Sequence, residues 1–106
     1  MKRRAFVFLL LVLAAGAALA QFPSRQVTIL VPIPPGGAPD IAARLIGDKL
    51  SQSLGQPVVI ENRTGANGNI ASELVAKSPP DGHTLGLLAD SQITINPHLY
   101  KKMPLD

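Results

Sequence analysis

The chain has 106 residues and a mass of 11.1 kDa, which allows one small domain, since independent domains usually run to about 100–150 residues. The sequence contains no cysteine, and this excludes disulfides, thiolate nucleophiles and thiolate metal sites. The formal net charge of +3 would be compatible with an acidic partner, but three of the ten basic residues lie within the first four positions.

The N-terminal residues have the three parts of a secretory signal. Residues 2–4 are basic, residues 5–15 are apolar, and Ala18-Leu19-Ala20 forms an A-x-A cleavage site before Gln21. An apolar run of this length is too short to span a bilayer, which needs about 20 residues. We therefore predict that residues 1–20 are a signal peptide and that residues 21–106 are periplasmic, with no stable membrane insertion after cleavage.

Removal of the signal peptide changes the charge balance. The remaining seven basic residues are matched by seven acidic ones, so that the mature chain is formally neutral. It also keeps only Phe22 and Tyr100 as aromatic residues. Without a basic surface or a stacking platform, a nucleic-acid partner is not expected.

The first predicted element is a buried strand at residues 27–31, which are apolar and mostly β-branched. Residues 32–39 follow as a loop, because four prolines and two glycines cannot form a ladder or a helix interior. A helix is predicted next: Pro39 suits its first turn, Asp40 favours the positive helix start, and Gly55 ends it.

The same reasoning gives the rest of the chain in order. A second strand at residues 57–61 leads into an Asn- and Gly-rich loop at 62–69, and a second helix covers residues 70–76. A Pro-Pro-Asp-Gly turn precedes a third strand at residues 84–88. Residues 90–92 are predicted to be a polar loop, with a short helical turn near Asn96-Pro97. The order predicts an α/β fold, a three-stranded parallel β-α-β-α-β unit with right-handed crossovers.

Three polar or glycine-rich segments follow the predicted strands, at residues 34–40, 62–69 and 90–96. Ligands collect at this edge of an open parallel sheet, and free N–H groups at Gly36, Gly37 and Ala38 would suit an anion. The alternative is that glycine and proline serve only to turn the chain. No phosphate-binding motif occurs, so a nucleotide site is disfavoured.

Catalysis finds little support in the sequence. His83 and His98 have no readable nucleophile, carboxylate partner or metal-ligand spacing, and both are predicted to be surface or packing residues. Asp40 is predicted to orient the first loop by accepting backbone N–H bonds. We expect no enzyme, no catalytic residue, no metal and no cofactor.

Longer stretches of the sequence form a recognisable pattern. Pro34-Pro35-Gly36-Gly37-x-x-Asp40, Pro57-Val58-Val59-Ile60-Glu61-Asn62-Arg63, Gly65-Ala66-x-Gly68-Asn69-Ile70, Pro79-Pro80-Asp81-Gly82 and Asn96-Pro97-x-Leu99-Tyr100 occur in this order. Together they resemble the Bug (TctC-like) family, the periplasmic solute-binding proteins of tripartite tricarboxylate transporters. The match covers essentially the whole mature chain.

The resemblance implies a two-domain clamshell receptor that binds a small organic carboxylate and passes it to membrane permease subunits. Residues 21–106 would then be part of the first, N-terminal ligand-binding domain. The positions carried over from the family lie in the loops after the first and third strands: Pro35, Gly36, Gly37, Ala38 and Asp40, then Ser91, Gln92 and Thr94.

Two departures from the family pattern leave alternatives open. Residues 90–94 replace the usual run of small hydroxyl residues, and family members continue through a second domain, which is expected to be absent here. Apolar side chains made for later elements would then be exposed, with Ile33, Leu87, Leu88 and Leu99 as candidates. The alternatives to a receptor are a truncated product without binding activity and a small periplasmic interaction domain that pairs through an open sheet edge.

Overall fold

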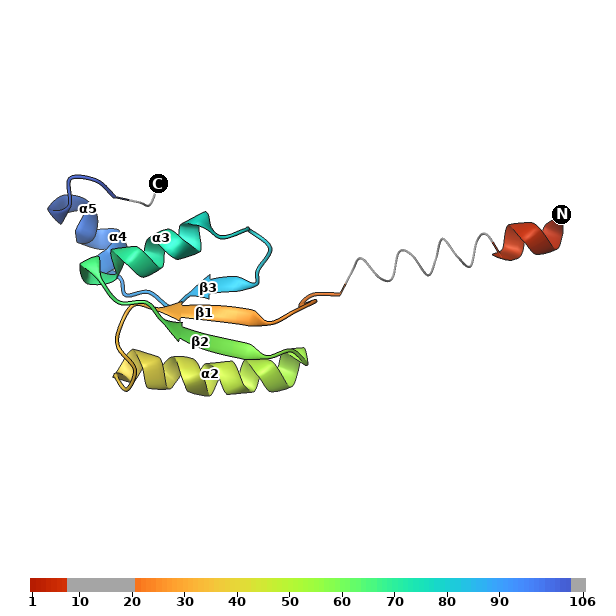
Figure 1. The fold of residues 1–106 in the computed structure, drawn as a ribbon, viewed down its shortest axis with the longest axis horizontal. Helices are drawn as coiled ribbons and strands as arrows, with labels where there is room; N and C mark the ends of the chain where they lie inside the picture. Colours follow the sequence, from red (N-terminus) through yellow and green to blue (C-terminus); the bar gives the residue numbers. More distant parts are fainter. Residues whose placement is uncertain (8–20, 104–106) are drawn as a thin grey trace.

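The computed structural model describes residues 1–7 and 21–103 (Figure 1). Residues 2–7 are helical, while the predicted cleavage site and most of the apolar run of the signal peptide lie outside the described residues. Within the described part, no helix combines the length and the hydropathy that crossing a membrane requires.

The described residues from 21 onward form a three-stranded parallel sheet with helices, as the sequence predicts. The strand order is β2-β1-β3, so that β1 lies in the centre. Val31 of β1 is in register with Asn62 of β2, and Leu30 is in register with Gly86 of β3. The elements are β1 (Val27–Val31), α2 (Ala38–Leu54), β2 (Val58–Asn62), the 3-10 helix η1 (Ala66–Gly68), α3 (Asn69–Lys77), β3 (Thr84–Gly86), α4 (Ser91–Thr94) and α5 (Asn96–Leu99).

Helix α2 covers one face of the sheet and packs through small residues. Ala43 and Gly47 are buried, and a Cβ on Gly47 would lie only 3.2 Å from Ile60 Cδ1. The core on this side contains Ile29, Val31 and Ala43. The larger side chains Ile41, Leu45 and Ile46, which share the helical spacing, are instead mostly exposed.

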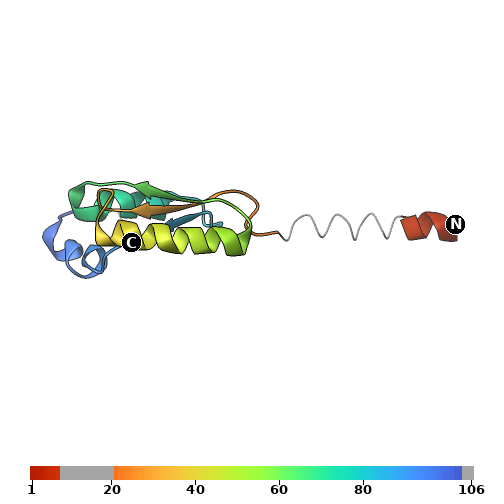
Figure 2. The same ribbon diagram turned by 90° about the horizontal axis from the view of Figure 1, so that it is seen from below.

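Helix α3 packs on the other face, so that the two helices flank the sheet (Figures 1 and 2). Side chains alternate between the faces along a strand, so the Leu30 side chain points away from α2. Gly86 is in register with Leu30 and lies on the same face. A Cβ on Gly86 would lie 2.9 Å from Val75 Cγ2 of α3. Opposite faces are what right-handed crossovers produce when β2 and β3 lie on either side of β1.

Two details of the secondary structure differ from the sequence-based expectations. The third strand ends at Gly86, although the N–H of Leu87 still donates to Leu30 O at 2.9 Å. The predicted polar loop at 90–92 is wrong, because residues 91–94 form α4, a helical turn closed by bonds from the N–H groups of Ile93 and Thr94 to Asp90 O.

The apolar residues expected to be exposed do not behave alike. Ile33 and Leu87 are partly buried and pack against the core cluster, so the prediction was wrong for them. Leu88 is half-buried, whereas Leu99 is 69% exposed, as predicted. The difference arises because Ile33 and Leu87 lie within two residues of the ends of β1 and β3 and continue the core face, whereas Leu99 is exposed on α5.

Candidate functional site

The first predicted loop connects β1 to α2 at the end of the sheet to which the strands point (Figure 1). Pro35, Gly36 and Ala38 are exposed, and Gly37 is half-buried at the N-cap position of α2. Gly36 has a φ of +97°, a conformation that favours glycine because other residues would place Cβ against the backbone. The loop therefore presents backbone rather than large side chains.

Asp40 is buried, and its carboxylate forms a hydrogen bond to the backbone of this loop. Its Oδ2 accepts hydrogen bonds from the Gly36 N–H at 3.0 Å and from Arg44 Nε at 3.1 Å. Its Oδ1 accepts one from Asn62 Nδ2 at 2.9 Å. The Arg44 hydrogen bond, followed by those from Gly36 and Asn62, lowers the pKa of Asp40 to about 2. The predicted orienting role of Asp40 agrees with this geometry.

Asn62 extends the support to a second point of the loop. The same Nδ2 group donates to Ile33 O at 2.9 Å, and Arg44 donates to Asn62 Oδ1 at 3.2 Å. The parallel register makes this possible, because Asn62 lies beside Val31 at the end of β1. Sequence reasoning missed both Arg44 and Asn62; the spacing of Asp40 and Arg44, four residues apart on one helix, was the available signal.

The lowered pKa of Asp40 gives a testable pH dependence. The ionised carboxylate stabilises the fold at pH values above 3.8, the ordinary pKa of an aspartate. This contribution is lost as the pH falls towards about 2, the pKa of Asp40 in the fold. We expect the wild-type chain to lose stability between about pH 4 and pH 2, and Asp40→Asn to remove this part of the pH dependence. Urea unfolding at several pH values measures it, with exposed Asp48→Asn as the control. An undiminished dependence in Asp40→Asn would contradict the assignment.

The predicted residues after the third strand lie in α4, and they differ in accessibility. Ser91 is half-buried, and Thr94 is exposed with its hydroxyl donating to Asp90 O at 3.0 Å. Gln92 is buried, and its Nε2 donates to Asn67 O at 3.0 Å. Within the described residues, Gln92 Oε1 has no hydrogen-bond partner. Gln92 is thus turned towards the loop after β2.

A network of amide side chains joins this loop to α5. Asn96 is fully buried; its Oδ1 accepts from Asn67 Nδ2 at 2.9 Å, and its Nδ2 donates to Asn67 O at 3.1 Å. The same Nδ2 group donates to Asn69 Oδ1 at 2.7 Å. Sequence reasoning identified the Asn- and Gly-rich loop but not its partner Asn96, since nothing local links residues so far apart.

The structure therefore brings the predicted residues together in two groups rather than one. Asp40 and Gly36 are linked to Asn62, the last residue of β2, whereas Gln92 is linked to Asn67 in the segment that follows β2. Both groups lie at the same end of the sheet (Figure 1). A groove of about 590 Å³ beside α3 includes none of the eight predicted ligand-binding residues.

Of the two histidines, His83 occupies a packing position and His98 a surface position. His83 is buried, with its ring edge-on to Phe22 at a centroid distance of 5.1 Å and its Nδ1 3.4 Å from Asp81 Oδ1. It precedes β3, at the opposite end of the sheet from the loops described above. His98 is exposed on α5. In the described part of the chain, no cluster of three metal-ligating side chains occurs.

Comparison with known sequences gives a consistent result. The model of the family described as "Tripartite tricarboxylate transporter family receptor" matches residues 42–106. A UPF0065 protein from the tcbD-tcbE intergenic region of Pseudomonas sp. is 43% identical over 107 residues, covering 97% of this chain and 32% of the relative. Protein BugT of Bordetella pertussis is 46% identical over 79 residues, covering 74% of this chain and 24% of the relative.

Solved structures resemble the fold as well. An R. palustris protein solved with adipate has a TM-score of 0.75 and 45% identity, covering 80% of this chain and 28% of that one. The periplasmic binding protein BugD has a TM-score of 0.70 and 38% identity, covering 76% and 26%. MatC from Rhodopseudomonas palustris, with bound malate, has a TM-score of 0.60 and 51% identity, covering 61% and 22%. The chain spans about a third or less of the length of these relatives.

Proposed function

Because the chain belongs to the tripartite tricarboxylate transporter receptor family, we propose that it takes part in capturing a small organic carboxylate in the periplasm. The resemblance drawn from the sequence motifs is thereby confirmed at the level of the family and the fold. The family consists of solute-binding proteins, and two structural relatives were solved with the carboxylates adipate and malate. Delivery to membrane permease subunits and export through residues 1–20 are part of the proposal.

The observation that best supports the proposal is that hydrogen bonds occupy the Asp40 carboxylate and fix the first loop. Asp40 would repel a carboxylate if its charge faced the ligand, but its oxygens are occupied by Gly36, Arg44 and Asn62. The first turn of α2 has backbone N–H groups without helical acceptors, and the helix dipole favours negative charge there. Gly37 and Ala38 can therefore offer backbone donors to a carboxylate in a loop whose shape is already fixed.

The second half of the proposed site consists of α4. The side chain of Ser91 is partly accessible and that of Thr94 is exposed, and the Thr94 hydroxyl would exchange its bond to Asp90 O for one to a ligand oxygen. Gln92 has a different role in this proposal, because its amide is buried against the loop after β2. Gln92 positions α4, while Ser91 and Thr94 supply the hydroxyl groups.

Calorimetric titration of the exported chain with adipate, malate and citrate tests the proposal, after circular dichroism has shown that the chain is folded. Saturable binding is expected in the wild type. Gly37→Val should abolish it, because a Cβ at position 37 would lie 2.7 Å from Ile33 Cδ1 and the added methyl groups would cover the loop amides. Ala76→Val, on the exposed surface of α3, is the matched control and should bind normally.

Two results would overturn the proposal for this chain. A folded wild type that binds none of the acids would assign carboxylate capture to longer proteins of the family. Unchanged affinity in a folded Gly37→Val variant would remove the first loop from the site.

A further inference from the structure

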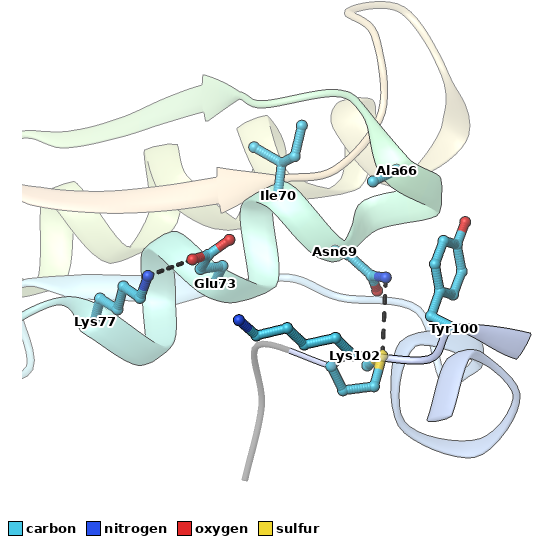
Figure 3. A pocket seen from close by; sticks show the side chains of 8 residues that line it. Ala66, Asn69, Ile70, Glu73, Lys77, Tyr100 and Lys102 are labelled. Atoms are coloured by element: carbon cyan, nitrogen blue, oxygen red, sulfur yellow. Dashed lines mark hydrogen bonds and ion pairs between the residues drawn. The ribbon is translucent and has the colours of Figure 1, made fainter. Parts of the chain in front are cut away.

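A second accessible hollow lies on the outer side of α3, away from the residues proposed above. The groove of about 590 Å³ runs between α3 and the segment that follows α5 (Figure 3). Its volume falls within the range of about 300–1,000 Å³ that small-molecule sites usually have. The polar residues lining it are Asn69, Glu73, Lys77, Tyr100 and Lys102.

The orientation of Asn69 at this groove is fixed by the buried amide network. A backbone carbonyl can only accept a hydrogen bond. The side-chain atom of Asn96 that faces Asn67 O must therefore be the donor Nδ2. Asn96 Nδ2 then also faces Asn69, which must offer its Oδ1, at 2.7 Å. The Nδ2 group of Asn69 is therefore turned in the other direction, towards the groove (Figure 3).

This donor is buried and poorly satisfied. Asn69 is only 6% exposed, and the acceptor of its Nδ2 among the described residues is the thioether sulfur of Met103 at 3.8 Å. A thioether is a weak acceptor, and a buried amide donor without a good partner is costly. The groove thus contains a preoriented donor that an oxygen atom would satisfy better than sulfur does.

The charges in the groove also favour an anion. Glu73 pairs with Lys77 along α3, whereas no carboxylate among the described residues forms an ion pair with Lys102. Figure 3 shows the Lys102 side chain extending along the groove towards Glu73 and Lys77. With two ammonium groups and one carboxylate, the lining has an excess positive charge.

We propose that this groove is a second binding site, for a small carboxylic acid whose oxygens accept from the Lys102 ammonium and from Asn69 Nδ2. Ile70 and Met103 provide apolar surface for the carbon chain of the acid. The site uses none of the residues of the first loop or of α4, so it neither requires nor replaces carboxylate capture at the sheet edge.

NMR titration of the full ¹⁵N-labelled chain with succinate tests this proposal, with 1,4-butanediol as an uncharged probe of the same length. The side-chain amide signal of Asn69, identified by its disappearance in Asn69→Asp, should shift saturably with succinate and not with butanediol. Lys102→Gln should weaken binding at least 10-fold. Lys101→Gln is the matched control, because Lys101 does not line the groove, and it should bind as the wild type does.

Two further variants guard against loss of folding as an explanation. Asn69→Asp keeps the Oδ1 acceptor for Asn96 but replaces the groove-facing donor with a charged oxygen, so it should abolish binding in a folded chain. Glu73→Gln removes the competing carboxylate from the groove and should tighten binding several-fold, a gain that misfolding cannot produce.

The outcomes also separate the groove from the proposed site at the sheet edge. If Gly37→Val abolishes binding at the loop but leaves the Asn69 shift unchanged, the groove is an independent site. The groove proposal is overturned if Asn69 does not shift, if Lys101→Gln weakens binding as much as Lys102→Gln, or if Gly37→Val removes the Asn69 response. The calorimetric test of the first loop is carried out in the Lys102→Gln variant, so that acid bound in the groove does not contribute to the measured heat.

Discussion

Replacement of Gly68 by alanine is expected to destabilise the fold by about 3 kcal/mol, from backbone strain and overpacking together. Gly68 has a φ of +87°, and a Cβ there would lie 2.2 Å from Gln92 Nε2. The Gln92 side chain would have to move, and its bond to Asn67 O would break, which separates α4 from the loop after β2. Urea unfolding monitored by circular dichroism measures the loss.

Gly55→Ala is the matched control for this prediction. Gly55 has a φ of +71° at the end of α2, but nothing lies within 4 Å of the position a Cβ would take. Its replacement should therefore cost only the strain of the left-handed conformation, about 1–2 kcal/mol. Equal losses for the two variants would show that contact with Gln92 contributes nothing at Gly68.

Replacement of Asn96 by alanine should have the second large effect, a loss of about 2–4 kcal/mol. Asn96 is fully buried, and its removal leaves two groups without their partner, Asn67 Nδ2 and the buried Asn69 Oδ1, while Asn67 O keeps only the bond from Gln92 Nε2. Buried polar groups that lose their partners cost more than the removed bonds contributed. We expect a lower urea midpoint and faster hydrogen exchange in α5.

Two variants separate the hydrogen bonds of Asn96 from its shape. Asn96→Asp has nearly the same volume but replaces the donating group with an oxygen opposite two acceptors, so it should destabilise at least as much as Asn96→Ala. Asn67→Gly removes one partly buried side-chain bond while tolerating the φ of +54°, and it should cost about 1 kcal/mol. A stable Asn96→Asp variant would mean that packing, not hydrogen bonding, determines the effect.

Much of the architecture could be predicted from the sequence because its signals are local. The apolar, β-branched run of β1 and the Pro39 and Gly55 boundaries of α2 are each readable within a few residues. The order of these elements then restricts the topology, since crossovers between parallel strands are right-handed. Asp40 could also be understood locally, because its loop partner Gly36 lies four residues away.

The features that could not be predicted from the sequence depend on contacts between residues that are far apart in the chain. Asn62 was predicted to begin a loop, but the register with Val31 places it in β2, where it can reach Asp40. Residues 90–92 were predicted to be a loop because they are polar; instead, Gln92 is buried against Gly68 and Asn67 as part of α4. In both cases a polar residue in the sequence acquires a buried partner only when the fold is complete.

The central position of β1 determines the order in which the fold can assemble. β1 precedes both of its neighbours in the chain, and its partners lie far along the sequence, with Val27 opposite Val58 and Thr28 opposite Thr84. The entropy of closing these long loops must therefore be lost before the stabilising sheet contacts form, and this slows folding. The β1–β2 pair can form first, but the face covered by α3 cannot be completed until β3 has docked on the other edge of β1.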